Sequence, residues 1–145
     1  MKHTTPDHKN GLLLSYKFRS RPDQLKCVRA KVTEAVTSCG CIDNIIQDFV
    51  IAVDEACQNI IRHAYQGQPD GEIILEICKE NDDIVVLLRD FAHRVDPNLI
   101  KPRDLDDVKP GGLGTYFIRE VMDEVTFMPP PQNVGNLLKM RKRIT

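Results

Sequence analysis

The first half of the chain carries one strand pattern followed by two helical patterns. Apolar and polar side chains alternate over residues 11–19, and this period of two predicts a half-buried strand. Apolar residues then recur at helical spacing from Pro22 to Gly40 and, over a longer span, from Asp43 to Tyr65. We expect the longer helix to face the core with one apolar stripe. The stripe consists of Ile46, Val50, Val53, Cys57, Ile60, Ile61 and Ala64.

The second half of the chain is mostly strand. Residues 72–79 and 83–90 both alternate, and Asn81-Asp82 between them favours a tight hairpin turn. Residues 91–110 have no clear period and are interrupted by prolines, so they predict a long loop of the kind that often serves as a lid. A helix with further strands at 124–128 and 134–143 completes the chain. The apolar stripe of that helix is Leu113, Phe117, Val121 and Val125, with Ile118 and Met122 beside it.

This order of elements predicts the fold class. Runs of strands and runs of helices, without strict alternation, are typical of an α+β domain. We expect a two-layer sandwich in which a mixed, mostly antiparallel sheet carries helices on one face. The length of 145 residues fits one domain, which we assign to residues 11–145. Residues 1–10 are polar, and we expect them to form a flexible lead.

Composition excludes several classes of partner. Twenty basic and twenty-one acidic side chains leave a net charge of −1, which provides no overall field for nucleic acid or an anionic membrane. No apolar run approaches the roughly 18 residues of a membrane span, and the first ten residues contain no apolar signal core. We therefore expect a cytoplasmic protein without direct nucleic-acid or membrane contacts. Five cysteines, an odd number, predict free thiols.

Two acidic positions are candidates for chemistry. Glu55 and Asn59 lie one turn apart on the same face of the long helix, so a carboxylate could act as a base beside a metal ligand. A solvated helix face would show the same spacing. Asp90 continues the inward parity of Val86 and Leu88 at a strand end, and a buried carboxylate needs a donor. It either caps a neighbouring loop or accepts a hydrogen bond from a ligand's amino group.

Three glycines precede the last helix. At Gly111, Gly112 and Gly114, missing side chains and the unpaired N–H groups of a helix start would let the backbone approach phosphate oxygens. The sequence is neither a P-loop nor a dinucleotide-binding turn. A plain flexible joint between loop and helix explains the same glycines.

Taken together, these segments resemble a known family. DEACQNIIRHAY (54–65), RDFAHRVDP (89–97) and PGGLGTYFIREVMDEV (110–125) are similar to the ATP-binding boxes of the GHKL ATPase/kinase superfamily. The similarity is greatest to the anti-sigma-factor serine/threonine kinases that act by partner switching. It covers residues 12–143 and implies the GHKL, or Bergerat, ATP-binding fold with a lid between the second and third boxes.

The resemblance implies a role for each candidate. Glu55 would orient or deprotonate a serine or threonine hydroxyl, Asn59 would hold Mg²⁺, and Asp90 would accept a hydrogen bond from the adenine amino group. From its spacing alone, one turn after Asn59, His63 is a further candidate for contact with the nucleotide, although a histidine at a helix edge is usually structural. The remaining nucleotide contacts would come from Gly111, Gly112, Leu113, Gly114 and Thr115.

The chain departs from the family in two places. The second box of the family reads D-x-G-x-G, whereas this chain has Ala92 and Arg94 at the glycine positions. We include both in the expected nucleotide site, with Arg94 as a charged donor to phosphate. The last strand of the family usually offers a threonine near the adenine, and the nearest positions here include Asn136.

The implied function is a Mg²⁺–ATP-dependent serine/threonine kinase. It would bind a sigma factor and phosphorylate an anti-anti-sigma (STAS) protein. A homodimer is a possible assembly. The absent box glycines motivate an alternative, a non-catalytic partner-binding regulator with weak or no ATP use. A third possibility is an α+β domain that binds no nucleotide.

Overall fold

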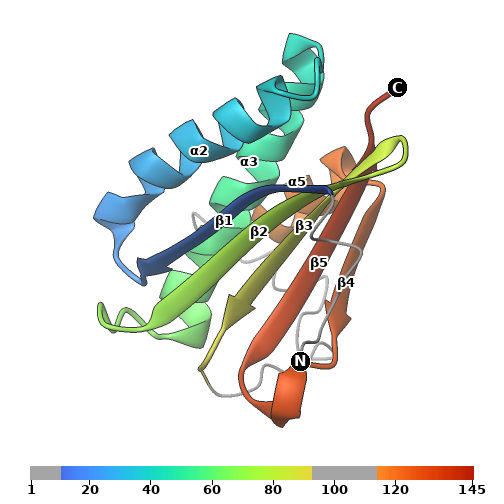
Figure 1. The fold of residues 1–145 in the computed structure, drawn as a ribbon. Coiled ribbons are helices and arrows are strands. Elements are labelled where there is room, and N and C mark those ends of the chain that lie inside the picture. Colours follow the sequence, from blue (N-terminus) through green and yellow to red (C-terminus); the bar gives the residue numbers. More distant parts are fainter. Residues whose placement is uncertain (1–10, 93–113) are drawn as a thin grey trace.

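A computed structural model describes residues 11–92 and 114–145 of the chain (Figure 1). The predicted lead at 1–10 and most of the predicted lid lie outside the described residues. The elements are β1 (Leu12–Arg19), α2 (Leu25–Thr37), α3 (Asp43–Asn59), β2 (Glu72–Glu80), β3 (Asp83–Asp90), α5 (Gly114–Val121), β4 (Glu124–Met128) and β5 (Asn136–Arg143). Three short helical turns accompany them, η1 (Pro22–Gln24), η2 (Ile60–Ala64) and η4 (Pro131–Asn133).

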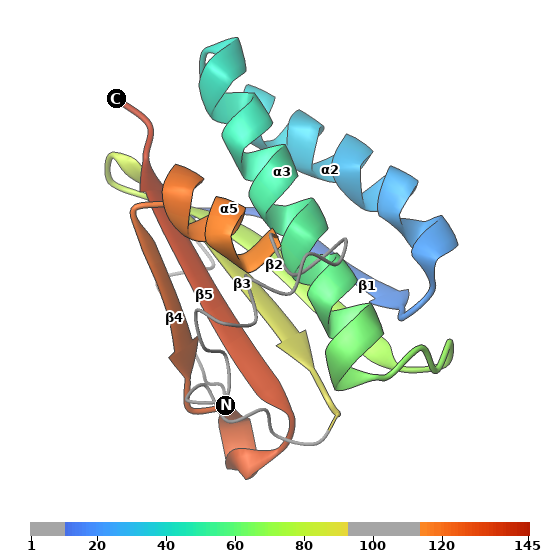
Figure 2. The same ribbon diagram turned by 180° about the vertical axis from the view of Figure 1, so that it is seen from behind.

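The strands form one five-stranded sheet in the order β1-β2-β3-β5-β4. The four pairings between these strands are all antiparallel. Helices α2, α3 and α5 cover one face of the sheet, as Figures 1 and 2 show from opposite sides. The prediction of a two-layer α+β sandwich is therefore confirmed, except that the described sheet is wholly antiparallel where a mixed, mostly antiparallel sheet was expected. No helix in the described ranges is long and apolar enough to cross a membrane.

The hairpin between β2 and β3 follows the sequence prediction closely. Glu80 pairs with Asp83, so Asn81 and Asp82 form a two-residue connection. Asn81 has a φ of 56°, the left-handed conformation that asparagine tolerates better than most residues. The register fixed by this turn sends alternate residues of both strands toward the helices, where they are buried. These residues are Ile73, Leu75 and Ile77 of β2 and Ile84, Val86 and Leu88 of β3.

Two helical stripes were predicted less accurately. In α3, Phe49 is fully buried although it was not assigned to the stripe, whereas Val50 is only partly buried. In α5, Phe117 is 46% exposed, whereas Ile118 and, just after the helix, Met122 are buried. The stripe predicted for α5 was drawn through Val125, but the helix ends at Val121 and Val125 belongs to β4. Val121 is partly buried against the core, so the predicted stripe is right at Val121 and wrong at Phe117.

The helix predicted to run to Tyr65 changes character at its end. After Asn59 the chain continues as η2, a π-helical turn in which the Tyr65 N–H donates to the Ile60 carbonyl at 2.9 Å. Such wide turns inside helices often accompany functional sites. Here the π turn directly follows Asn59 and contains His63, two residues of the candidate site.

Candidate functional site

Four elements carry the described candidate residues. Helix α3 carries Glu55 and Asn59, and η2 carries His63. Strand β3 ends at Asp90, and α5 begins with Gly114 and Thr115 and packs beside α3 (Figure 2). Four further residues of the predicted site lie outside the described residues, namely Arg94, Gly111, Gly112 and Leu113.

The carboxylate of Asp90 is buried and well bonded. Its residue is only 2% exposed, as the inward parity predicted. Oδ1 accepts a hydrogen bond from Nδ2 of Asn136 at 2.9 Å and another from the backbone N–H of Ala92 at 3.0 Å. Asn136 is the directly paired residue on β5. Asp90 therefore caps the turn that follows it, and Ala92 takes part in the site through its backbone.

Burial determines the electrostatics of Asp90. Loss of water raises the pKa of its carboxyl above the usual value, because the charged form is the one that hydration stabilises. Hydrogen bonds from Asn136 and Ala92 act in the opposite direction and offset part of the effect. A carboxylate held in this way is a directional acceptor with little freedom to move, which suits recognition of an N–H donor.

Glu55 has a different environment. It is half-buried, and this burial raises its pKa; the neighbouring Asp54 carboxylate raises it further, while the Arg62 guanidinium opposes both. Asp54 is itself held in place, by Nη1 of Arg29 at 2.9 Å and by Nε2 of Gln58 at 2.7 Å. A carboxylate whose pKa is raised toward the working pH is a better proton acceptor than an ordinary glutamate.

Asn59 and His63 follow Glu55 at successive turns. Asn59 is half-buried, and its side-chain oxygen Oδ1 is shielded from solvent; His63 is exposed. An amide oxygen is a ligand type that Mg²⁺ accepts, and Mg²⁺ is commonly bound through one or two protein oxygens together with substrate phosphates. The described part of the chain contains no cluster of three or more His, Cys, Asp or Glu that could hold a metal. The shielded amide oxygen of Asn59 is a ligand type that fits a Mg²⁺ ion held mainly by substrate phosphates.

Tyr65 is a residue to which sequence reasoning assigned no role. It is the last residue of the motif at 54–65. Its hydroxyl forms hydrogen bonds with the backbone of Glu72, where β2 begins, and of Phe91, directly after β3. Gly135 was also missed, although its φ of 76° and its contact with Asp90 make it part of the site's frame. The sequence offered one indication for Tyr65 only: a tyrosine beside a buried apolar stripe usually forms a hydrogen bond through its hydroxyl.

Comparisons with known proteins identify the family of the chain. A family model described as "Histidine kinase-like ATPase domain" matches residues 18–142. The serine-protein kinase RsbW of Bacillus pumilus is 30% identical over 124 residues, which cover 78% of this chain and 76% of that protein. The serine-protein kinase RsbW of Bacillus subtilis is 29% identical over 125 residues, with 80% and 78% covered.

A solved structure supports the fold. A crystal structure of the RsbU and RsbW domains of a Mycobacterium tuberculosis protein superposes with a TM-score of 0.63 at 14% identity. The match covers 90% of this chain and 31% of that larger chain. At this identity the likeness concerns the fold, which agrees with the five-stranded sheet and its helical layer. With the family model and the sequence relatives, it follows that the chain belongs to the histidine kinase-like ATPase domain family, among the RsbW-like anti-sigma-factor kinases.

Proposed function

We propose that this protein is an ATP-dependent serine/threonine kinase that binds a sigma factor and phosphorylates an anti-anti-sigma (STAS) partner. The observation that carries the proposal is the buried, hydrogen-bonded Asp90 at the end of β3, next to a helix that bears Glu55 and Asn59. Family membership supports it. A cytoplasmic location and the ability to form a homodimer belong to the same proposal.

Each described residue has a distinct task in the proposed reaction. Mg²⁺–ATP supplies the phosphoryl group when bound. Asp90 accepts a hydrogen bond from the adenine amino group and thereby orients the base, and Asn59 provides an oxygen ligand for Mg²⁺. Backbone N–H groups at the start of α5, where Gly114 and Thr115 lie, hold phosphate oxygens. Catalysis of this kind depends mainly on positioning and on neutralising charge.

Glu55 is the proposed base. Because its burial and the charge of Asp54 raise its pKa, its carboxylate holds a proton more readily than an exposed glutamate would. Glu55 would accept the proton of the incoming serine or threonine hydroxyl, while bound Mg²⁺–ATP would supply the phosphoryl group and leave as Mg²⁺–ADP. The bridge from Arg29 to Asp54 keeps the second carboxylate fixed beside Glu55, so the shift in pKa is built into the helix pair.

A label-transfer assay tests the kinase proposal. Purified protein, Mg²⁺, labelled ATP and the cognate STAS partner should give a labelled partner, and Glu55→Ala should abolish the transfer. Glu34→Ala is a matched control, since Glu34 is an exposed glutamate on α2. Transfer by Glu55→Ala at the wild-type rate would contradict the role of Glu55, and no transfer by the wild type would contradict the kinase assignment.

A second candidate function is a partner-binding regulator without catalysis. It is favoured by one observation, the alanine and arginine at positions 92 and 94 where the family's second box has glycines. This candidate predicts a complex with a sigma factor or STAS protein that forms equally well with and without ATP, and equally well in an Asn59→Ala variant. The kinase proposal predicts that adding ATP alters the formation of the complex and that Asn59→Ala alters it as well.

A further inference from the structure

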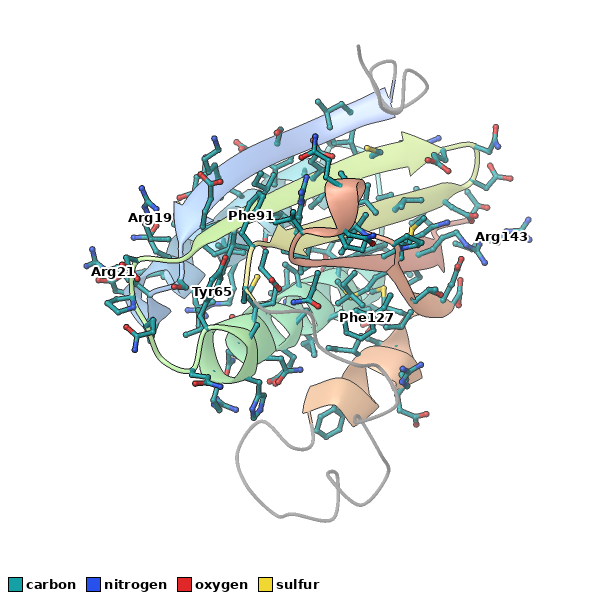
Figure 3. All side chains as sticks on the ribbon, turned by 90° about the horizontal axis from the view of Figure 1, so that it is seen from below. Arg19, Arg21, Tyr65, Phe91, Phe127 and Arg143 are labelled. Atoms are coloured by element: carbon teal, nitrogen blue, oxygen red, sulfur yellow. The ribbon has the colours of Figure 1, made fainter. Side chains whose placement is uncertain are left out.

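The hydroxyl of Tyr65 lies between the start of β2 and the end of β3, on the side of the molecule where Figure 3 labels Tyr65 and Phe91. It donates a hydrogen bond to the carbonyl oxygen of Glu72 at 2.6 Å. It accepts a hydrogen bond from the backbone N–H of Phe91 at 2.8 Å. One oxygen therefore connects the end of the helix that carries Asn59 with both β2 and the residue directly after Asp90.

The strand register shows what this oxygen replaces. Asp90 pairs with Ile73, so the next antiparallel pair along the ladder would join Phe91 to Glu72. The hydroxyl of Tyr65 satisfies both of those backbone groups instead. It thus forms a side-chain rung at the place where β3 ends, and the chain beyond Asp90 leaves the sheet from a fixed point.

The ring of Tyr65 is itself held in position. A Cβ atom added at Gly71 would lie 2.5 Å from Cε1 and 2.6 Å from Cζ of the Tyr65 ring, so the glycine backbone packs directly against the ring. Gly71 is fixed in turn by Ser20, which is fully buried: the Gly71 N–H donates to Ser20 Oγ at 2.9 Å, and the Ser20 N–H donates to the Gly71 carbonyl at 2.8 Å.

The other side of the Asp90 segment is held by β5. Asn136 donates to the Asp90 carboxylate, and Gly135 packs so closely that an added Cβ would overlap the Asp90 carbonyl and the Cα of Phe91. The backbone from Asp90 to Phe91 is therefore confined between Tyr65 and the start of β5. Removing the Tyr65 contact releases one of these two restraints.

We propose that Tyr65 is a positioning residue for purine recognition, because its hydroxyl fixes the backbone that aims the Asp90 carboxylate at a 6-amino group. This inference rests on the proposed function and adds a determinant of base specificity to it. Tyr65 contacts neither the nucleotide nor the reacting hydroxyl in this proposal. It acts through the Phe91 N–H, and its loss should alter discrimination between bases more than binding of the phosphates.

Binding of two nucleotides tests the inference. The probes are ATP and purine riboside triphosphate, which lacks the 6-amino group, titrated with Mg²⁺ into the full chain. Wild type should prefer ATP by at least about tenfold, because an acceptor left without its donor is costly. Tyr65→Phe should reduce that ratio about three- to tenfold, as expected for one hydrogen bond. Exchange of the Phe91 amide hydrogen should become faster in the same variant.

Two further variants make the result specific. Tyr16→Phe is the matched control, since its hydroxyl bonds Sγ of Cys27 on the β1 side of the molecule, and it should keep the wild-type ratio. Gly71→Ala displaces the Tyr65 ring but keeps the hydroxyl, and it should lower the ratio as Tyr65→Phe does. It also carries the test if Tyr65→Phe does not fold.

The possible failures are distinguishable. A wild type that prefers ATP while Tyr65→Phe and Gly71→Ala keep the same preference would overturn the positioning role and leave the proposed function intact. An unchanged exchange rate of the Phe91 amide in Tyr65→Phe would overturn it as well. A wild type that binds neither nucleotide would overturn the proposed function, and the positioning role with it.

Discussion

At the scale of single residues, the candidate site combines two carboxylates in different environments. Asp90 is buried and receives hydrogen bonds from Asn136 and Ala92, whereas Glu55 is half-buried beside a second acid. Burial raises the pKa of both carboxyls. The first arrangement fixes an acceptor in space, and the second makes a proton acceptor stronger. Sites that divide recognition and proton transfer in this way are common among enzymes.

Replacing Asp90 by asparagine should separate stability from binding. The pKa of Asp90 is raised in the folded protein above its usual value of 3.8, so the folded state binds this proton more tightly than the unfolded state does. The wild type therefore loses stability as the pH rises from about 3.8 through the raised pKa of the folded state. The Asp90→Asn variant does not lose stability in this way, because an asparagine side chain does not titrate. Its free energy of unfolding relative to wild type should therefore improve with pH across that window, while ATP binding weakens about 10- to 100-fold.

Denaturant unfolding at several pH values and ATP titration together check this outcome. Asp70→Asn is a suitable control for the first measurement because Asp70 is exposed. A stability difference between Asp90→Asn and wild type that stays constant with pH would contradict the linkage.

The acidic limb of the kinase reaction should follow the charges around Glu55. Since the Asp54 carboxylate raises the pKa of Glu55, Asp54→Asn should move the acidic limb of label transfer to lower pH. Arg62→Gln should move it to higher pH, because Arg62 acts in the opposite direction. Asp48→Asn, on the same helix but paired with Lys142, should leave the limb in place. Shifts of equal sign in the first two variants would contradict this explanation.

At the scale of elements, the sequence predicted what depends on local periodicity. The alternation in β2 and β3, with the Asn81-Asp82 turn between them, determined the register and the buried face of both strands. The sequence misplaced Phe117 on the buried side of α5, because apolar residues occur on more than one side of this helix and tertiary packing decides which of them are buried. One of the closest contacts of the site, between Gly135 and Asp90, joins residues far apart in the chain. No single-sequence pattern encodes such contacts.

Gly135 should be more sensitive to substitution than other left-handed glycines. Gly135 and Gly67 have φ values of 76° and 81°, but only at Gly135 would an added Cβ overlap other backbone atoms. Gly67→Ala should cost about 1 to 2 kcal/mol of unfolding free energy through backbone strain alone. Gly135→Ala should cost about 3 kcal/mol or more, because strain and overlap add. Equal losses in denaturant unfolding would contradict the packing argument.

At the scale of the whole molecule, the core contains thiols as well as hydrocarbon. All five cysteines are free, as predicted, and they range from exposed Cys27 to buried Cys57 and Cys78. Burial raises the pKa of Cys78 to about 11 and raises that of Cys57 further, so neither thiol ionises near neutral pH. The rate at which each cysteine thiol is alkylated should therefore depend on how deeply that thiol is buried.

Alkylation with iodoacetamide near neutral pH should modify Cys27 first. Cys57 should react only when the domain unfolds, and its labelling should be slower than that of Cys27 by at least about a thousandfold. Mass spectrometry of peptides over time measures each rate, and Cys27→Ser should remove the fast phase alone. Labelling of Cys57 at the rate of Cys27 in native protein would show that the helical layer is not stably packed.

The π turn after Asn59 makes the length of this segment as specific as its composition. Each residue of an α-helix rotates the chain by about 100°, so deleting one residue between Asn59 and Tyr65 would swing the tyrosine hydroxyl away from the β2–β3 edge. Substitutions at exposed positions such as Arg62 or His63 leave that angle unchanged. Among related sequences, an insertion or deletion between Asn59 and Tyr65 would therefore signal altered nucleotide use more reliably than a substitution at an exposed position of the same segment.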